Sequence, residues 1–407
     1  MTIINPNYIY IDNKFQENLA VAFDTKIQAI DSVENLQKLY PNASLETPRE
    51  NSVLYPGFIN THVHLEFSAN KTTLQYGEFM PWLNSVIENR EELVGSCGNE
   101  VMLNACNEMM CSGVTTFGAI SSFGTELEVC TKTPQKVLFF NELIGSNATT
   151  ADMLYADFLE RLAESKNCVN DGIIPAIAIH SPYSVHPIVL QRAIAVAKKE
   201  GLPLSAHFLE SQAEREWLEK EKGDFLDFFE KFFSTSMPVT NIEEFMNAFN
   251  SVPTHFTHAV QATEEELNFL SSKGHSIAHC PRSNRLLGCG RLSIETLIEN
   301  DMPFTTATDG LSSNNTLSIL DELRAALMLH HLAPLEELAS LLIKSITSNP
   351  AEIFSLNSGK IEVGKDADFA FVTLPAKPSN LKSIALQTIL HVNEVDEVWI
   401  EGKKFFS

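Results

Sequence analysis

Two histidines separated by one residue, His62 and His64, stand near the end of the apolar stretch at residues 55–67, which reads YPGFINTHVHLEF. Pro56 and Gly57 open this stretch, and we expect a short buried strand to follow them. Alternate side chains of a strand lie on the same face, so the two imidazoles are expected about 6 to 7 Å apart along the backbone. This spacing suits two ligands of one metal ion, although an isolated HxH more often marks an ordinary strand end.

Strand-like and helix-like segments alternate between residues 56 and 356. Helical periodicity is clear at residues 189–201 and 263–274, and the second of these begins with a Thr N-cap. The eight expected strands are the run into His62 and residues 113–117, 136–142, 174–180, 202–208, 254–258, 275–280 and 302–309. Eight such units in succession predict a (β/α)8 TIM barrel of the α/β class.

Polar side chains gather at one end of the expected barrel strands. Active sites of such barrels lie at the C-terminal ends of the strands. The residues at or just beyond those ends are His62, His64, His180, His207, His255, His279 and Asp309. Because all of them can bind a metal or transfer a proton, they predict a metal-dependent active site at that rim.

The two ends of the chain contain short strand-like segments separated by Asn, Asp and Gly turns. They occupy residues 3–55 and the segment from residue 359 to the C-terminus. We therefore expect one small β-sandwich domain, built from residues 1–55 and 357–407, beside a catalytic barrel domain at residues 56–356.

Composition restricts the partners of the protein. The chain has 407 residues, of which 44% are hydrophobic, and a formal net charge of −23. That charge argues against nucleic acid, which is bound through clustered Lys and Arg. No signal peptide and no apolar run of membrane-spanning length are expected. Seven cysteines without a CxxC pair indicate reduced thiols, so we expect a cytoplasmic protein that acts on a small molecule.

Six motifs occur in the order in which they occur in the amidohydrolase superfamily. They are PGFINTHVH, HSPYS at 180–184, HFLE at 207–210, THFTH at 254–258, AHCPRSN at 278–284 and TDGLSSNN at 308–315. Along nearly its whole length the chain resembles the branch that contains adenosine-type, S-adenosylhomocysteine and guanine deaminases and the chlorohydrolases. The phrases FINTHVHLEFS, QYGEFMPWLNSV and CPRSNRLLG are most similar to aminodeoxyfutalosine deaminases.

The resemblance implies one divalent metal ion, and zinc is the expected ion. Two-metal relatives carry a carboxylated lysine at the end of the fourth strand, where this chain has Ile179 and His180. Three imidazoles and one carboxylate suit a borderline ion and leave a position for water, although iron, nickel and manganese use similar ligands. The expected ligands are His62, His64, His207 and Asp309.

The activity implied is hydrolytic deamination of the adenine ring of 6-amino-6-deoxyfutalosine. Glu210 is expected to shuttle protons, Asp309 to accept a proton from the attacking water, and His255 to stabilise developing charge. His258 is expected only to pack or hydrogen-bond nearby. Deamination of S-adenosylhomocysteine, methylthioadenosine or adenosine is the alternative reaction, and a catalytically silent scaffold is the alternative outside the enzymes.

Substrate contacts are expected from five residues, one of which is Glu210. His180 is expected to touch the nucleoside, or otherwise to support the site. Trp82 is expected to stack on a ring, or otherwise to pack within a helix. Arg282 and Arg285 are candidates for binding a substrate carboxylate through a guanidinium, with a loop-anchoring or surface role as the alternative.

Several features have a structural interpretation. His279 is expected to support the site and Asn284 to order its loop. A ribose contact is left open between Glu88 and Glu91. The phenylalanine-rich segment at residues 225–249 is interpreted as core or subunit contact, with a lid as the less favoured alternative. A homodimer is expected by analogy with the family alone, and no membrane or nucleic acid partner is expected.

Overall fold

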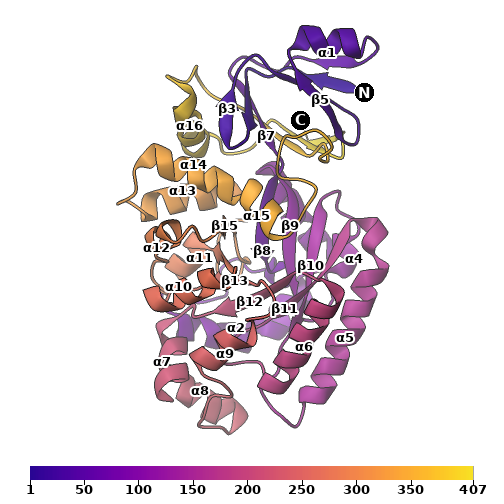
Figure 1. Ribbon diagram of the computed structural model, residues 1–407. Helices are drawn as coiled ribbons and strands as arrows, with labels where there is room; N and C mark the ends of the chain where they lie inside the picture. The colour runs from indigo at the N-terminus through magenta and orange to yellow at the C-terminus, as the bar shows by residue number, and fades with distance from the viewer. Residues whose placement is uncertain (407) are drawn as a thin grey trace. The chain divides into compact units, whose positions relative to one another are not determined.

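The structure is a computed structural model that describes residues 1–406 (Figure 1). These residues form two compact units. The first comprises residues 1–60, 106–117 and the chain from residue 318 onward, and the second comprises residues 61–105 and 118–317. The expected domain boundaries at residues 55/56 and 356/357 stay a prediction.

A parallel eight-stranded sheet forms the barrel. Its neighbour order is β15-β14-β13-β12-β11-β10-β9-β8, so each strand lies beside the next one along the chain. The strands are β8 (Phe58–Val63), β9 (Val114–Ser121), β10 (Lys136–Leu143), β11 (Ile173–Ile179), β12 (Leu204–Phe208), β13 (His255–His258), β14 (Ser276–His279) and β15 (Phe304–Thr306). All eight expected strands are present, and the TIM-barrel prediction is confirmed.

Two contacts join the first and last strands of the barrel. The backbone N–H of Asp309 donates to the carbonyl of His62 at 3.1 Å. The hydroxyls of Thr61 and Thr305 lie 2.7 Å apart. Closure of the sheet brings the C-terminal ends of the first and last strands together around one mouth.

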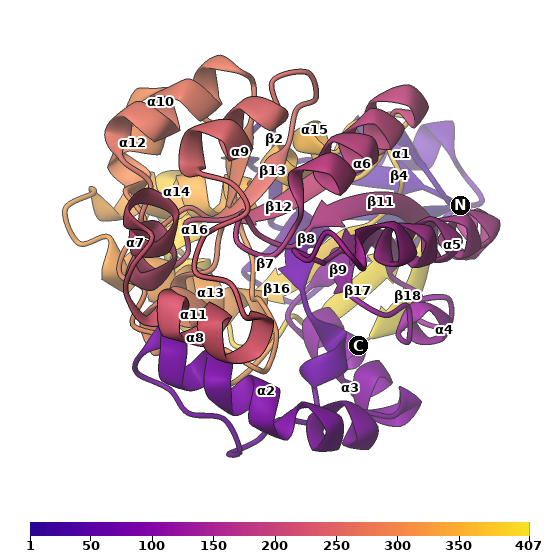
Figure 2. The ribbon, with the colours of Figure 1, turned by 90° about the horizontal axis from the view of Figure 1, so that it is seen from below.

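Helices separate the barrel strands, as the alternation predicts. α5 packs on β10 and β11, and α6 packs on β11 beside it (Figure 2). α10 begins with a capping box formed by Thr263 and Glu266, which agrees with the expected N-cap. The helices are α2 (Phe79–Ser96), α3 (Asn99–Cys111), α4 (Leu127–Cys130), α5 (Ala151–Asn167), α6 (Pro187–Glu200), α7 (Gln212–Lys220), α8 (Asp224–Phe233), α9 (Ile242–Ala248), α10 (Glu264–Ser272), α11 (Pro281–Leu286) and α12 (Ile294–Glu299).

The first unit contains two further sheets with a shared core. Phe23 of the four-stranded sheet lies edge-on to Phe369 and Trp399 of the six-stranded sheet, with ring centroids 5.1 and 5.4 Å apart. β7 and β16 pair antiparallel, which joins the two ends of the chain and confirms the small β-sandwich. The orders are β5-β4-β1-β6 and β18-β17-β16-β7-β2-β3.

The remaining elements complete the first unit. α14 packs against α13 and α16. Within residues 1–406, no helix is both long and apolar enough to cross a membrane. The strands are β1 (Thr2–Ile4), β2 (Tyr8–Ile11), β3 (Lys14–Gln16), β4 (Ala20–Phe23), β5 (Ile27–Asp31), β6 (Ser44–Glu46), β7 (Ser52–Pro56), β16 (Phe369–Thr373), β17 (Glu397–Ile400) and β18 (Lys403–Phe406). The helices are α1 (Val33–Leu39), α13 (Ile319–Leu329), α14 (Leu335–Ser345), α15 (Ser348–Ile353) and α16 (Ile384–His391).

Candidate active site

β8 delivers the first two histidines of the site. His62 lies within the strand and His64 directly follows its last residue, with extended backbone at φ −103° and ψ 105°. The alternation of the strand therefore continues to His64, and the two imidazole centroids lie 5.0 Å apart. A Cβ at Gly310 would lie 2.8 Å from the Cβ of His64, so this close approach requires glycine.

The four expected ligands come together at the mouth of the barrel. Nε2 of His207, from β12, lies 3.4 Å from Nε2 of His64. Oδ1 of Asp309 lies 3.7 Å from Nε2 of His62 and 3.8 Å from Nε2 of His64. His62, His64 and Asp309 thus form one group of candidate metal ligands, and His62, His207 and His258 form a second group that shares His62.

The other ring nitrogen of each histidine has a partner of its own. Such contacts fix the orientation of metal-binding imidazoles and the nitrogen that remains available. The Nδ1 partners are the hydroxyl of Thr257 for His62 at 3.2 Å, the carboxylate of Glu66 for His64 at 3.6 Å, and the carbonyl of His180 for His207 at 2.7 Å.

The donor set fits a divalent cation. Nε2 of His62 is buried and has no hydrogen-bond partner within residues 1–406, which is unusual for a buried nitrogen. Burial, and then the neighbouring His207, lower the pKa of His62 well below its ordinary value, so the ring is a neutral donor. Burial also lowers the pKa of His64, but Glu66 and Asp309 outweigh it and raise the pKa to about 10, so this point favours positive charge.

Asp309 is held in one orientation after β15. Its backbone lies in the left-handed region at φ 58°. Oδ2 accepts hydrogen bonds from the hydroxyls of Ser283 at 2.8 Å and Ser313 at 2.7 Å. Burial raises the pKa of Asp309, but the charge of His64 and the two hydroxyls lower it below its ordinary value overall. The carboxylate therefore stays ionised, as a metal ligand must.

The turn after β12 positions Glu210. The backbone N–H groups of Leu209 and Glu210 donate to the carboxylate of Glu214 at 3.1 and 2.8 Å. Glu214 lies in the first turn of α7, and its own N–H donates to the N-cap Ser211 at 3.1 Å. The start of the helix therefore fixes the backbone on which Glu210 stands.

The carboxyl group of Glu210 lies beside His258 and Asp309. Its Oε1 lies 3.6 Å from Nε2 of His258, and the side chain belongs to the same group of candidate ligands as Asp309. Burial raises the pKa of Glu210 well above its ordinary value, and the charges of Asp309 and Glu214 add to this effect. The surroundings of the two carboxyl groups thus shift their pKa values in opposite directions.

The structure corrects the expectation for the two histidines of β13. His255 lies deeper in the barrel, where its Nδ1 is 2.7 Å from the hydroxyl of Ser276 and its Nε2 is 3.0 Å from that of Thr305. His258, at the end of the strand, faces Glu210, and its ring centroid lies 5.7 Å from that of His207. His258 therefore occupies the position beside the expected metal ligands that the sequence had assigned to His255.

Asn284 holds His258 in place. Nδ1 of His258 lies 2.8 Å from Oδ1 of Asn284, which follows the first turn of α11. Asn284 therefore does more than order its own loop, because it fixes the tautomer of the neighbouring ring. His279 is fully buried at the end of β14, and its carbonyl accepts from the N–H of Ala307 at 2.9 Å.

His180 lies beside the histidine cluster at the end of β11. Its ring centroid is 5.4 Å from that of His207, and its Nδ1 lies 2.6 and 2.7 Å from the hydroxyls of Ser181 and Ser184. Burial, and then the charge of His64, lower the pKa of His180 to about 3. The ring is neutral, and no hydrogen bond within residues 1–406 occupies its Nε2.

Trp82 and the two expected arginines have different surroundings. Nε1 of Trp82 donates to the carbonyl of Ser312 at 2.8 Å, which fixes the half-buried ring. Arg282 donates to Oδ1 of Asn315 at 3.1 Å and to the carbonyl of Thr316 at 2.8 Å, so its guanidinium anchors the loop after β15. Arg285 is exposed, as are Glu88 and Glu91 on α2.

The phenylalanine-rich segment packs beside the site. The ring of Phe225, at the start of α8, lies 4.6 Å from that of Tyr183 and 6.2 Å from that of Phe79 on α2. Figure 2 shows α8 beside α2. Phe225 and Phe229 are buried, which agrees with their interpretation as core contacts, whereas Phe232 and Phe233 are exposed.

Sequence reasoning did not identify several supporting residues. Glu214 stands four residues after Glu210 and could have been found as an acidic residue in a first helical turn. Glu66 follows His64 by two residues, and a single Glu at this spacing gives little signal of its own. Ser283 and Ser313 gave no signal of their own, because short hydroxyl side chains are common in loops.

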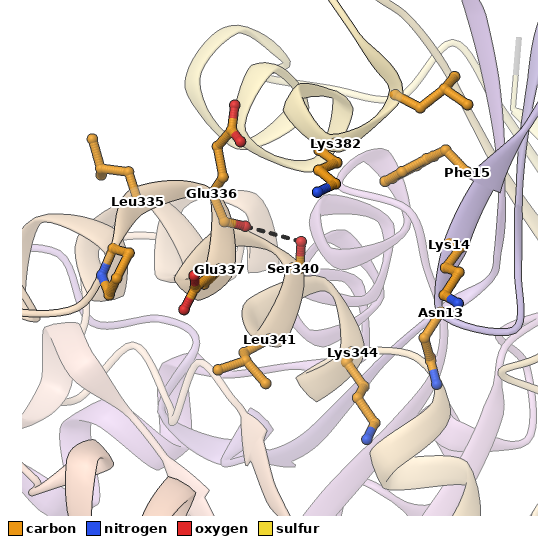
Figure 3. A pocket seen from close by; sticks show the side chains of 12 residues that line it. Asn13, Lys14, Phe15, Leu335, Glu336, Glu337, Ser340, Leu341, Lys344 and Lys382 are labelled. Carbon is orange, nitrogen blue, oxygen red and sulfur yellow. Dashed lines mark hydrogen bonds between the residues drawn. The ribbon is translucent and has the colours of Figure 1, made fainter.

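A hollow of about 980 Å³ in the first unit is not the candidate site (Figure 3). α14, β3 and the turn at Leu381–Ser383 line it. Its charged lining consists of Glu336 and Glu337 on α14 and of Lys14, Lys344 and Lys382. None of the histidines, carboxylates or hydroxyls described above contributes to its wall.

Comparisons with known proteins agree with this geometry. The amidohydrolase family matches residues 53–405 of the chain. The chain is 46% identical over 404 residues to an aminodeoxyfutalosine deaminase of Nitratiruptor sp., and 35% identical over 410 residues to an adenosine deaminase of Helicobacter pylori. Each alignment covers 99% of both chains.

A solved structure matches the whole chain. The crystal structure of Helicobacter pylori aminofutalosine deaminase in complex with methylthio-coformycin has a TM-score of 0.94 and 35% sequence identity, with 100% of both chains covered. Together with the family match over residues 53–405, this likeness accounts for the barrel, the sandwich and the order of the site motifs. The chain therefore belongs to the amidohydrolase family.

Proposed function

We propose that this protein is a metal-dependent deaminase that converts 6-amino-6-deoxyfutalosine and water to futalosine and ammonia, a step of menaquinone biosynthesis. The observation that carries the proposal is a cluster of histidines beside two carboxyl groups, Asp309 with a lowered pKa and Glu210 with a raised pKa. A chain with this site matches an aminodeoxyfutalosine deaminase along its full length at 46% identity.

One divalent ion, which we propose to be zinc, would be held by His62, His64, His207 and Asp309. When bound, such an ion supplies a water molecule whose pKa is lowered toward neutrality, so that it can act as a nucleophile. The absence of a lysine at the end of β11, where His180 follows Ile179, favours a single ion.

His258 and Asp309 are the proposed acceptors of the proton from the attacking water. Since Oδ1 of Asn284 accepts the Nδ1 proton of His258, the neutral ring presents an unprotonated Nε2. Once protonated, the same ring stabilises negative charge that develops on the oxygen attached to the purine carbon. His258 therefore takes over the role that the sequence assigned to His255.

Glu210 is the proposed proton donor to the purine. Its protonated carboxyl gives a proton to the ring nitrogen beside the amino-bearing carbon as water attacks that carbon. It then takes part in returning a proton to the amino group, which leaves as ammonia. Nε2 of His180 and the fixed ring of Trp82 are the proposed contacts to the nucleoside.

The test is ammonia release by the zinc-loaded protein. The kcat/KM should be compared for aminodeoxyfutalosine, S-adenosylhomocysteine, methylthioadenosine, adenosine and guanine, with Glu210→Gln as the inactive control. We expect a clear preference for aminodeoxyfutalosine. Absence of ammonia release from all five compounds would reject the substrate class.

Adenosine-type deamination is the second candidate. The 35% identity to an adenosine deaminase over the whole chain favours it. Equal or better use of adenosine or methylthioadenosine in the same assay would establish this second function and leave the metal chemistry unchanged.

A cytoplasmic location and a homodimeric state also belong to the proposal. Seven free cysteines support a reducing compartment. The homodimer rests on analogy with the family, and light scattering of the purified protein would test it.

A further inference from the structure

An arginine and a phenylalanine are stacked on each other in the second unit. The guanidinium carbon of Arg90, on α2, lies 4.5 Å from the ring centroid of Phe123, in the loop after β9. Phe123 is 48% exposed, although large apolar side chains are usually covered. A guanidinium on an aromatic face keeps its plane fixed while its N–H groups remain free at the edge.

The charge of Arg90 has no partner. No acidic side chain, carbonyl or hydroxyl within residues 1–406 forms an ion pair or hydrogen bond with its guanidinium. Glu88 and Glu91 lie close to it in sequence but form no ion pair with it. The two residues thus form an unused cationic surface backed by an aromatic ring.

The loop that carries Phe123 is anchored next to the catalytic cluster. The hydroxyl of Ser122 donates to Oε2 of Glu142 at 2.6 Å, and Oε1 of Glu142 lies 3.8 Å from Nδ1 of His207. The N–H of Gly124, at φ 78°, donates to the hydroxyl of Ser121 at 2.9 Å and tightens the turn. Phe123 is therefore held at the rim of the barrel, two side chains away from an expected metal ligand.

The net charge of the chain also favours a local cation at this rim. Since the chain carries a net charge of −23, an anionic substrate needs a local cation to approach the site.

The two arginines expected from sequence are weaker candidates for this role. The guanidinium of Arg282 is already bound to Asn315 and Thr316. Arg285 is exposed on α11 and stacks on no aromatic ring within residues 1–406. Of these three arginines, Arg90 combines an unpaired guanidinium within residues 1–406 with a position over an aromatic ring at the barrel rim.

We propose that Arg90, held by Phe123, binds the carboxylate on the aryl arm of the substrate and so determines specificity among purine nucleosides. This inference rests on the proposed function, since that substrate carries a benzoate far from its purine ring. The purine lies at the histidine cluster, and the arm extends toward α2. The guanidinium then pairs with the carboxylate through two parallel N–H···O bonds.

The test is Arg90→Met in the zinc-loaded enzyme, with two substrates compared. For aminodeoxyfutalosine we expect kcat/KM to fall about 10- to 100-fold, mainly through KM, because a charge-assisted pair is lost. For methylthioadenosine, which lacks the carboxylate, kcat/KM should stay within about twofold of the unsubstituted enzyme. Arg90→Lys should restore part of the loss, since it keeps the charge but not the planar fork.

Arg285→Met is the matched control, since it removes an equally exposed guanidinium from the neighbouring α11. This variant should not lower kcat/KM for one of the two substrates more than for the other. An equal loss for both substrates in Arg90→Met, or a selective loss in Arg285→Met, would overturn the assignment of Arg90.

Product binding separates this inference from the proposed function. Futalosine and inosine differ in the aryl carboxylate arm, and their affinities can be measured without turnover. Arg90→Met should weaken the binding of futalosine more than that of inosine. This result is expected even if adenosine proves to be the better substrate, and in that case only the proposed function fails. Equal affinities of the variant and the unsubstituted enzyme for futalosine would reject the role of Arg90.

Discussion

At the scale of single residues, the site separates two carboxyl groups that experience similar burial. Asp309 is stabilised as an anion by two hydroxyls and by His64. Glu210 accepts no such hydrogen bonds within residues 1–406, and the charge of Asp309 adds to the cost of ionising it. The pKa of Asp309 is therefore lowered while that of Glu210 is raised, and such a separation suits general acid and base catalysis.

Replacement of the acid should abolish turnover without emptying the site. Glu210→Gln keeps the size of the side chain and leaves the four expected metal ligands intact. We expect kcat to fall about 10²- to 10⁴-fold, because proton transfer to the ring is lost. Bound zinc, measured by elemental analysis, should remain equal to that of the unsubstituted protein. Near-normal turnover in this variant would contradict the proton-shuttle role.

The two histidines of β13 should respond differently to the same substitution. His258→Gln should lower kcat per folded molecule about 10²- to 10⁴-fold, beyond any loss of stability caused by its hydrogen bond to Asn284. His255→Gln should lower the free energy of unfolding by about 1 to 3 kcal/mol, because buried hydrogen bonds to Ser276 and Thr305 are disturbed. Activity per folded molecule and urea unfolding distinguish the two. A catalytic loss confined to His255→Gln would restore the expectation drawn from the sequence.

A second buried acid should make stability depend on pH. Burial, followed by the charge of Glu66, raises the pKa of Glu126 to about 8. The folded state then keeps a proton that the unfolded chain releases above about pH 4.5, so stability falls as pH rises from there to about 8. The glutamine of Glu126→Gln cannot ionise. The free energy of unfolding of this variant should therefore fall less steeply with rising pH than that of the unsubstituted protein, and the two slopes should differ by up to about 1.4 kcal/mol per pH unit. Parallel pH profiles of the two proteins in urea unfolding would exclude this effect.

Residue types and the hydrophobic pattern predicted that His62, His64, His207 and Asp309 lie at or near strand ends, and the family resemblance singled them out as expected ligands together with Glu210 as the proton shuttle. The choice between His255 and His258 could not be made from that pattern. Both lie in β13, which is only four residues long, and the backbone turns to φ 73° at His258. The later residue of a barrel strand lies nearer the mouth, and this rule is the signal that favours His258.

At the scale of elements, the start of α7 controls the position of Glu210. Ser211 caps the helix, Glu214 in the first turn receives two backbone N–H groups, and Glu210 lies between the strand and the cap. The same type of cap begins α10 at Thr263, away from the cluster. The two N-caps thus fix different segments: the cap of α7 fixes the turn that carries Glu210, whereas the cap of α10 lies away from the histidine cluster.

Removal of each cap should therefore separate stability from catalysis. Ser211→Ala and Thr263→Ala should each cost about 1 kcal/mol of stability, since each leaves an N-terminal N–H without an acceptor. Only Ser211→Ala should also lower kcat, because it loosens the turn that carries Glu210. Thermal unfolding and steady-state kinetics on both variants measure this difference. Equal kcat values in the two variants would refute the positioning role of the α7 cap.

Sequence periodicity was sufficient for the strands and the long helices. It identified all eight barrel strands and the capping box of α10, since both depend on local patterns. It could not assign the contacts of α8, because the pairing of Phe225 with Tyr183 joins segments far apart in the chain. The arginine on α2 was missed for the same reason, as its partner Phe123 lies on another loop.

At the scale of the whole molecule, metal binding should stabilise the fold. The expected ligands come from β8, β12 and the chain after β15, which includes both the first and the last strands of the barrel. An ion present at about 100 times its dissociation constant should add about 2.7 kcal/mol to the free energy of unfolding. Chelation should therefore lower the melting temperature, and added zinc should restore it. His64→Ala protein should show no response to either treatment, and an unchanged melting temperature in the chelated parent protein would argue against a metal at this site.

The N–H of Asp309 joins the carbonyl of His62 across the seam between the last and first barrel strands. During synthesis, the N-terminal part of the chain leaves the ribosome with His62 and His64 long before residue 309 is made. A nascent chain can therefore present imidazoles to metal ions but cannot complete their four-residue set. Coordination by all four expected ligands is possible only after the seam has formed. Binding of the ion by all four would therefore indicate that the barrel is complete.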